Sequence, residues 1–405
     1  MKILVVCQYY NPEPVRISDI CEELVRLGHE VDVVTGVPNY PMGYIYEGYK
    51  HGKRRDEKLN GVNVHRSFTV GRRSGVLFRF LNYYSYAISS TMYAGRLKKE
   101  YDVVFVNQLS PVMMACAGVK YKKKHGTKLV YYCLDLWPES LVVGGISRGS
   151  LIYKVFNKIS KKLYASSDKI LVTSKNFISY FKEQFGMSED KLSYLPQYAE
   201  DMFKPTEPVE KETVDLTFAG NIGAAQSVET IIKAAAELKD CRQLRFNIVG
   251  DGSSLEGCKN LAAELEADNV IFHGRKSLEE MPELYRQADA MLVTLSDDPL
   301  ISKTLPGKVQ TYMAAGKPII GAINGETAEV IGEAECGYCG PAEDHVALAD
   351  NIRRFLESDK RRFGRNAVSY YEKYFTKDDF INALLAALSG NEESQVAERE
   401  VLKVK

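Results

Sequence analysis

Two lysines and a Pro-Gly turn stand before a helical pattern in KTLPGKVQTYMAAGKPII, residues 303–320. Val309 and Tyr312 have the spacing of one buried helix face, and Gly316 is typical of a helix end. The pattern therefore predicts a helix that begins beside Lys308. Because a helix N-terminus already favours negative charge, a lysine at this position favours an anion such as a phosphate.

Three more loops have the composition of phosphate-binding loops. Each follows an apolar run that predicts a strand, at 214–220, 244–250 and 269–274. Glycines in such loops let backbone amides approach a phosphate. Taken alone, the first two loops can also be explained as ordinary turns, and the third, with Arg275, as surface charge. Together they predict a diphosphate site, with candidates Gly220, Gly223, Gly250, Asp251, Gly252, Arg275, Lys303 and Lys308.

The elements that would position these loops alternate between strand and helix patterns. Strands are predicted at 2–7, 30–36, 62–66, 102–108, 128–134 and 168–174, and then at 214–220, 244–250, 269–274, 289–295 and 318–323. Near-continuous apolar runs separated by helices are typical of parallel sheets covered on both faces. We therefore expect an α/β protein with two doubly wound, Rossmann-like domains that face an interdomain cleft.

The expected domain limits follow from composition. Residues 1–203 form the first domain, a Pro- and Glu-rich linker spans 204–213, and 214–365 form the second domain. The helical stretch 366–389 is expected to return to the first domain. The tail 390–405 is polar and is expected to be mobile.

Composition limits the classes of function. Residues 1–205 contain 30 Lys and Arg against 19 Asp and Glu, whereas the whole chain has a net charge of zero. The neutral total argues against a nucleic-acid partner, and the basic half suits an anionic surface. The eight cysteines are scattered, and Cys336 and Cys339 have no second pair to complete a zinc site. No metal and no cofactor are expected. The sequence has no transmembrane run, and a cytoplasmic location is predicted.

The order of several motifs resembles glycosyltransferase family 4, whose retaining enzymes have the GT-B fold, over residues 1–388. The motifs are RLGHEVDVVTG (26–36), FAGNIGAAQSVETIIKAAAEL (218–238), IVGDGSSLE (248–256), VIFHGRKSLEEMPELYRQADAMLVTL (270–295) and LPGKVQTYMAAGKPIIG (305–321). The stretches QYYNPEP, GVPNYPMG and DLWPESL are most similar to the branch that serves colanic acid, capsule and O-antigen synthesis, which includes N-acetyl-L-fucosamine transferases.

The resemblance implies that Lys308 binds the diphosphate of a nucleotide sugar, with Arg275 and Lys303. The chain also departs from the family. Asn221 and Gln226 stand where many members have diphosphate-binding cations. Lys303 and Thr311 stand where many members have a Glu-x7-Glu pair, and Thr311 can hydrogen-bond a hydroxyl group. The four residues complete the predicted donor site.

The first domain is expected to carry the catalytic carboxylates and to bind the acceptor. In DLWPES, Asp135 directly follows a predicted strand, and the resemblance places this motif near the transferred sugar. Asp135 and Glu139 could accept a proton or stabilise an oxocarbenium-like transition state, or they could simply cap a helix. Arg16, in the loop after the first strand, could bind an anionic acceptor or be surface charge.

The segment 71–99 is basic and aromatic. Leu77, Phe80, Leu81 and Tyr84 share one helix face, most of which is expected to be buried. The arginines of this segment would suit the inner face of a membrane, as would an undecaprenyl-diphosphate-linked acceptor, which the resemblance implies. A retaining, metal-independent transfer from a UDP-sugar is therefore predicted. A GT-B epimerase and a non-catalytic scaffold are the alternatives.

Overall fold

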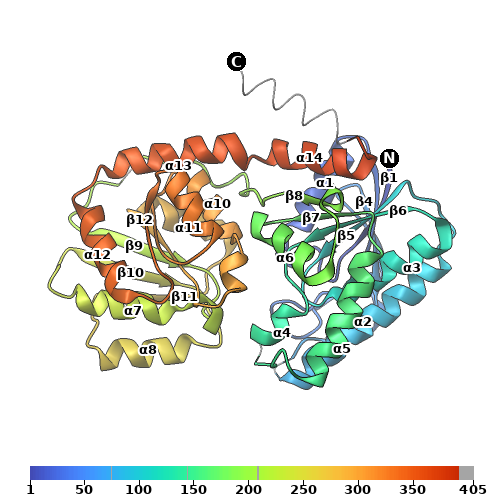
Figure 1. Ribbon diagram of the computed structural model, residues 1–405, viewed down its shortest axis with the longest axis horizontal. Coiled ribbons are helices and arrows are strands. Elements are labelled where there is room, and N and C mark those ends of the chain that lie inside the picture. The colour runs from blue at the N-terminus through green and yellow to red at the C-terminus, as the bar shows by residue number, and fades with distance from the viewer. Residues whose placement is uncertain (74, 144, 208, 392–405) are drawn as a thin grey trace, which may run out of the picture. The chain divides into compact units, whose positions relative to one another are not determined.

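The computed structural model describes residues 1–391 apart from 74, 144 and 208, and these residues form two units (Figure 1). Unit 1 contains Met1–Thr173, Phe177–Leu195 and the described chain from Ile381 onward. Unit 2 contains Ser174–Asn176 and Pro196–Phe380. In the described part of the chain, no helix has the length and apolar character needed to cross a membrane.

Unit 1 is built on a sheet with the strand order β3-β4-β2-β1-β5-β6-β7-β8. Only the β3–β4 pair is antiparallel among its pairings. The strands β1, β5 and β6 are almost wholly buried, as their apolar sequences require. The strands are β1 (Lys2–Val6), β2 (Glu30–Gly36), β3 (Asp56–Leu59), β4 (Val62–Ser67), β5 (Val103–Gln108), β6 (Lys128–Cys133), β7 (Lys169–Val172) and β8 (Leu192–Tyr194).

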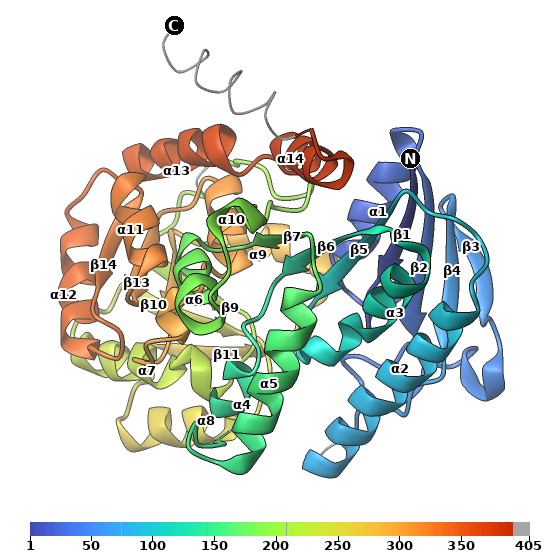
Figure 2. The same ribbon diagram turned by 45° about the vertical axis from the view of Figure 1, so that its right-hand side comes forward.

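Helices cover this sheet, and the long α2 lies beside α3 in both ribbon views (Figure 2). The helices of unit 1 are α1 (Ile17–Arg26), α2 (Val76–Arg96), α3 (Cys116–His125), α4 (Glu139–Val143), α5 (Leu151–Ala165) and α6 (Lys175–Phe185), with most of α14 (Lys377–Ser389). Short 3-10 turns are η1 (Lys50–Gly52), η2 (Val112–Ala115) and η3 (Glu189–Lys191). Lys128 ties α14 to β6, because its Nζ donates to Ala387 O at 2.6 Å.

Unit 2 contains a fully parallel sheet with the order β11-β10-β9-β12-β13-β14. Its strands are β9 (Val214–Ala219), β10 (Leu244–Val249), β11 (Val270–Gly274), β12 (Ala290–Thr294), β13 (Ile319–Ala322) and β14 (Gly337–Gly340). Its helices are α7 (Val228–Glu237), α8 (Leu255–Glu264), α9 (Met281–Gln287), α10 (Gly307–Ala314), α11 (Glu326–Glu333), α12 (His345–Leu356) and α13 (Lys360–Tyr374), with the 3-10 turns η4 (Ala224–Gln226), η5 (Leu278–Glu280) and η6 (Ile301–Lys303).

Two apolar layers hold this sheet between its helices. Successive side chains of a strand point to opposite faces of the sheet, so Ala290 and Leu292 of β12 belong to one layer, whereas Met291 and Val293 belong to the other. The first layer includes α7, α8 and α12, and the second includes α10, α11 and α13. Figure 1 shows α7 and α8 below the sheet and α10 and α13 above it.

Several local expectations are confirmed. Gly316 has a positive φ of 66° at the end of α10. The two doubly wound α/β units are present, and eleven of their strands lie where the apolar runs predicted them.

Three local expectations are wrong or incomplete. The face of α2 that carries Leu77, Phe80 and Leu81 is not buried, because these side chains are 66, 49 and 40% exposed. The stretch 366–389 is not one helix, since α13 ends at Tyr374 and α14 begins at Lys377. Strands β3, β8 and β14 were not predicted, because they are short or lack an apolar run.

Candidate functional site

The strand order of unit 2 reverses between β9 and β12, which is where ligands bind in such sheets, at the carboxyl ends of the strands. The loops that follow these two strands meet each other. Thr294 Oγ1 donates to Gln226 O at 2.6 Å, and Ser296 N donates to Ala225 O at 3.0 Å. The structure therefore brings residues 220–226 to the beginning of the β12–α10 loop.

The loops after β9 and β10 pack on each other through glycines. A Cβ on Gly250 would lie 1.8 Å from Gly220 O, and a Cβ on Gly252 would lie 2.2 Å from Ile222 O. The backbones are also hydrogen-bonded, because Ile222 N donates to Asp251 O at 2.9 Å. Only glycine therefore fits at positions 250 and 252. Because of this close packing, the two loops form one continuous surface of backbone.

Lys308 lies directly beneath this surface, at the start of α10. Its Nζ is 4.1 Å from the centre of the Phe218 ring and 2.6 Å from the position that a Cβ on Gly220 would occupy. The ammonium group has no hydrogen-bond acceptor among the described residues. Burial lowers the pKa of Lys308 to about 8. A half-buried cation without a partner among the described residues, beside glycine-rich backbone, is a site prepared for an anion.

The polar side chains of the β9 loop mainly hold that loop together. Asn221 Nδ2 donates to Gln226 Oε1 at 3.1 Å, so both predicted residues are in the cluster and pair with each other. Gly223 is in contact with the same pair, since its Cβ would lie 2.8 Å from Asn221 Nδ2. Asp251 Oδ1 accepts from the amide of Gly252 at 2.7 Å.

The remaining predicted residues lie at the edges of the cluster. Arg275 follows the edge strand β11, whose Gly274 O accepts from Gly250 N at 2.9 Å. Lys303 ends the turn η6. Neither side chain forms a hydrogen bond or an ion pair with a described residue. Thr311 is buried in α10, and its hydroxyl donates back to Gly307 O at 3.0 Å.

The sheet of unit 1 also reverses its order, between β1 and β5, and Asp135 lies close to that point. Its Oδ2 accepts from the amide of Ser110, in the loop after β5, at 3.0 Å. Burial raises the pKa of this carboxyl group above its usual range, and Ser110 and Arg72 oppose the rise. Asp135 is thus a half-buried carboxylate at the carboxyl end of β6.

Glu139 lies four residues further on and has a different environment. It is 4% exposed, and its Oε1 accepts from the hydroxyls of Tyr153 at 2.8 Å and Tyr180 at 3.1 Å. Its Oε2 pairs with Arg148 Nε at 3.2 Å. Both oxygens are therefore occupied, one by hydroxyls from α5 and α6 and the other by Arg148 from the α4–α5 loop, which is the geometry of a structural carboxylate.

Sequence reasoning missed a second buried carboxylate in the same unit. Glu13 accepts from the amides of Tyr10, Asn39 and Tyr40 at 3.1, 2.8 and 2.7 Å. It therefore joins the loop after β1, which also contains the half-buried Arg16, to the loop after β2. Burial raises the pKa of Glu13 to about 7. The only signal in the sequence was a glutamate between two prolines.

A third carboxylate, Glu326, was also missed. It begins α11 at the carboxyl end of β13 and is 1% exposed. Its Oε2 accepts from the backbone amide of Asn176 at 3.2 Å and from the Ser174 hydroxyl. Its Oε1 has no hydrogen-bond partner among the described residues.

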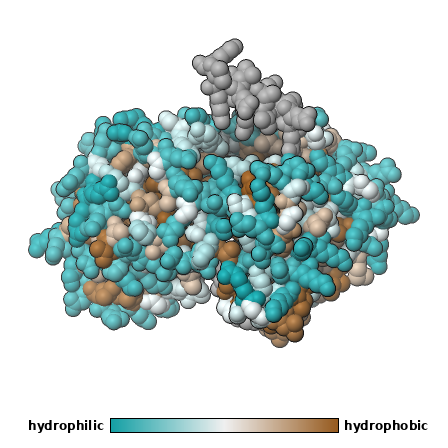
Figure 3. All heavy atoms as spheres, viewed as in Figure 1, coloured by the Kyte–Doolittle hydropathy of each residue, from teal (hydrophilic) through white to brown (hydrophobic). Residues whose placement is uncertain are grey.

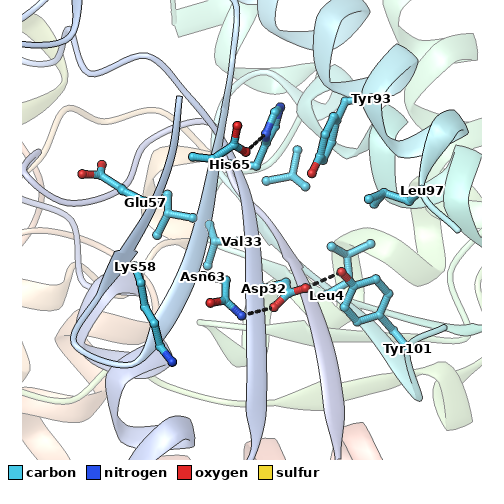
Figure 4. Close-up of a pocket in the computed structure, with 13 residues that line it drawn as sticks. Leu4, Asp32, Val33, Glu57, Lys58, Asn63, His65, Tyr93, Leu97 and Tyr101 are labelled. Carbon is cyan, nitrogen blue, oxygen red and sulfur yellow. Dashed lines mark hydrogen bonds and ion pairs between the residues drawn. The ribbon is translucent and has the colours of Figure 1, made fainter. Parts of the chain in front are cut away.

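A cavity of about 380 Å³ in unit 1 lies away from all of these residues (Figure 4). In Figure 4 the Asp32 carboxylate points at both Asn63 and Tyr101, at 2.8 and 2.5 Å. His65 Nδ1 lies 2.5 Å from Asp56 Oδ1. Because these polar groups already pair with one another, the cavity is better explained as a structural network than as the site.

Two family models match the chain, and together they span most of it. The model described as Glycosyltransferase Family 4 matches residues 15–197. The model described as Glycosyl transferases group 1 matches residues 199–370, which include every loop of the cluster in unit 2. Among the described residues, no group of three or more His, Cys, Asp or Glu side chains could hold a metal ion.

Curated relatives have names of the same kind. A protein of Pseudomonas aeruginosa named as a glycosyltransferase, WbjE, is 27% identical over 71% of this chain and 75% of its own length. A protein of Escherichia coli K12 named as a colanic acid biosynthesis glycosyl transferase, WcaI, is 23% identical over 96% of this chain and 100% of its own length.

Solved structures share the fold at low identity. HepE of Anabaena, crystallised with UDP, superposes with a TM-score of 0.72 at 16% identity, covering 96% of this chain and 100% of HepE. WaaG, described as a glycosyltransferase involved in lipopolysaccharide biosynthesis, superposes with a TM-score of 0.68 at 16% identity, covering 96% of this chain and 100% of WaaG. These likenesses show that the two units are those of the GT-B fold.

Proposed function

The chain belongs to the glycosyltransferases, since a family 4 domain is followed by a group 1 domain, and on that premise we propose that it transfers a sugar from a UDP-sugar to a lipid-linked saccharide. The single observation that carries the proposal is Lys308, a half-buried lysine whose ammonium has no acceptor among the described residues and lies beside glycine-rich backbone. HepE, which shares the fold, was crystallised with UDP, and WcaI is named for colanic acid biosynthesis. Both support a UDP-sugar donor and a role in surface-polysaccharide assembly.

The proposed chemistry is a retaining transfer. The bond between the anomeric carbon and the diphosphate oxygen breaks, and a bond to an acceptor hydroxyl oxygen forms while the hydroxyl proton is released. Negative charge then grows on the diphosphate, so the Lys308 ammonium and the backbone of the β9 loop stabilise the departing UDP. A lysine and backbone amides could perform this task without a metal ion.

The first test is the melting temperature of the purified protein with UDP, GDP, TDP and their sugars. A ligand at 100 times its dissociation constant stabilises a protein by about 2.7 kcal/mol, which corresponds to a rise of roughly 5 °C or more. We expect that rise with UDP and a UDP-sugar. No shift with any nucleotide would overturn the donor site. Binding without turnover on any lipid-linked acceptor would favour a scaffold, and conversion of the UDP-sugar alone would favour an epimerase.

We propose Asp135 as the catalytic carboxylate, because one of its oxygens is not used by a neighbouring element and burial raises its pKa. Asp135→Asn is expected to lower kcat by about a hundredfold or more, with the UDP-induced melting shift unchanged. Glu139→Gln is the matched comparison, and it is expected to lower the melting temperature instead, because it removes the charge that Arg148 pairs with. Equal kcat in Asp135→Asn and the unmodified protein would refute the assignment.

We propose that unit 1 binds the inner face of the plasma membrane through an apolar patch on α2 and α5, which both pack against η2. The side chains of the patch are 40 to 77% exposed, and Figure 3 shows hydrophobic residues gathered at the lower end of unit 1. Exposed cations Arg79, Lys154 and Lys158 accompany them. The patch consists of Leu77, Phe80, Leu81, Ile88, Met92, Leu151, Ile152 and Val155.

Sedimentation with phosphatidylglycerol vesicles tests the apolar patch. The double change Leu77→Asp and Leu151→Asp is expected to reduce the vesicle-bound fraction by about tenfold, because it removes buried apolar area and adds repulsion from anionic lipid. Val346→Asp is the control, since Val346 is 53% exposed on α12 of unit 2. Equal sedimentation of the double variant and the control would exclude the patch as the membrane contact.

A further inference from the structure

Unit 2 contains a cavity of about 730 Å³ at the amino ends of its strands, whereas the Lys308 cluster lies at their carboxyl ends. Lys211 precedes β9, Asp289 precedes β12 and Lys317 precedes β13, and all three line the cavity together with the first turns of α13. None of the glycine-rich loops takes part in it. Its volume falls within the range of ligand pockets.

The most buried cation of this cavity is Lys317, which is 5% exposed. Its Nζ donates to Arg286 O at 3.2 Å and to Ala288 O at 3.0 Å. An ammonium group has three protons, so one remains for a further acceptor. The pKa of Lys317 is lowered to about 8, chiefly by burial and to a smaller extent by the neighbouring Lys211 and Arg286, whereas Asp289 opposes the fall. The positive charge of Lys317 therefore lies at a buried position, where it lowers the stability of the folded protein.

The rest of the lining increases that positive charge. Six cations line the cavity against two carboxylates, Glu207 and Asp289. Lys211 pairs with Asp289 at 3.0 Å and with Asp215 at 2.5 Å, and Arg286 pairs with Glu283 at 2.7 Å, so the excess of positive charge comes from the other four. The cations are Lys211, Arg286, Lys317, Lys360, Arg361 and Arg365. An anion is the ligand that this imbalance favours.

The helix α13 contributes three of these cations in an unusual position. Lys360 and Arg361 lie in its first turn, directly after the N-cap Asp359, although the helix dipole favours negative charge there. Arg361 has no hydrogen-bond or ion-pair partner within the described residues, and Arg365 reaches Asp359 only at 3.9 Å. These cations are therefore available to an incoming ligand.

A purely structural explanation accounts for only part of the cluster. Lys317 binds carbonyls at the end of α9, and a cation is favourable at a helix C-terminus. That role would explain one buried lysine. It does not explain why α13 presents Lys360, Arg361 and Arg365 to the same cavity.

We propose that this cavity of unit 2 is a second anion site, which binds a phosphate-bearing ligand through Lys317, Arg361 and Arg365. Two guanidinium groups and an ammonium group suit a diphosphate better than a carboxylate. The phosphate could belong to a small metabolite or to a phospholipid headgroup. The site does not depend on the proposed transferase activity.

Calorimetric titration with inorganic pyrophosphate tests the proposal. All variants carry Lys308→Met, so that the other anion site is silent. Adding Arg361→Ala and Arg365→Ala is expected to weaken binding by about tenfold or more, because two charge-assisted contacts are lost. Adding Arg362→Ala is the control, since Arg362 neighbours them on α13 but pairs with Glu335 at 2.6 Å and does not line the cavity.

Both arginines are exposed, so their loss should leave the melting temperature within a few degrees, which a thermal scan verifies. Sedimentation with phosphatidylglycerol vesicles then distinguishes the source of the phosphate. Loss of pyrophosphate binding with unchanged vesicle binding identifies a small metabolite, and loss of both identifies a headgroup. The proposal is overturned if pyrophosphate does not bind to the Lys308→Met protein, or if it binds the double-arginine variant as tightly as the control.

Discussion

Lys308→Met should abolish the UDP-induced melting shift and at the same time make the unliganded protein more stable. Methionine has a similar length but needs no acceptor, whereas the half-buried Lys308 ammonium has none among the described residues. Because the pKa of Lys308 falls from 10.5 to about 8, the native protein is destabilised on the order of 2 kcal/mol below pH 8. Thermal scans with and without UDP measure both effects. Lys276→Met, which removes an exposed lysine that pairs with Glu280, is the control.

Both the stability gained by Lys308→Met and the affinity for UDP should depend on pH. Between about pH 8 and 10.5 the native Lys308 is neutral while the unfolded lysine still holds its proton. The unfolded state binds more protons in this window, so the stability gained by Lys308→Met should shrink as the pH rises. UDP affinity of the unmodified protein should also fall above pH 8, by up to about tenfold per pH unit. A flat affinity profile from pH 7 to 10 would show that Lys308 does not bind the diphosphate.

Gly250→Ala should destabilise unit 2 severely and remove UDP binding. The new Cβ would lie 1.8 Å from Gly220 O, and φ at this position is 147°, which an L-residue rarely adopts. The two loops cannot both remain in place, so a loss of about 3 kcal/mol or more is expected. Differential scanning calorimetry and UDP titration provide the two readouts.

Gly257→Ala is the control for this change. Gly257 lies in α8, and no atom beyond its chain neighbours and the adjacent backbone of its own helix lies within 4 Å of its Cβ position. Because alanine is the better helix former, this variant should gain about 0.5 to 1 kcal/mol and bind UDP normally. If Gly250→Ala melted and bound UDP like this control, the close packing of the two loops would be refuted.

The fold could be predicted well because its signals are local. Apolar runs such as 103–108 are buried on both faces, and they indicate parallel strands independently of the neighbouring sequence. Turn chemistry is equally local, since the Ser-x-x-Glu pattern of Ser277 and Glu280 forms a capping box. The break between α13 and α14 has a local signal too, since Thr376 is a residue that favours a helix start and its Oγ1 accepts from the amide of Asp379 at 3.1 Å.

The site could be predicted only where one residue acts on nearby backbone. Lys308 follows its Pro-Gly turn directly, and its role as a cation at a helix start was visible in the sequence. Glu13 was not visible, because its three amide partners come from two loops, one of them 26 or more residues away. The exposure of Leu77 and Phe80 was not visible either, because helical spacing identifies an apolar face but not what covers it.

The apolar patch belongs to unit 1, whereas the Lys308 cluster belongs to unit 2. If the patch binds the enzyme to lipid, the two substrates reach it by different kinds of diffusion. A lipid-linked acceptor is met by lateral diffusion, so that its effective concentration depends on its density per membrane area. The nucleotide sugar is met from the aqueous volume. Kinetic constants for the acceptor should then scale with the lipid surface in the assay, and those for the donor should not.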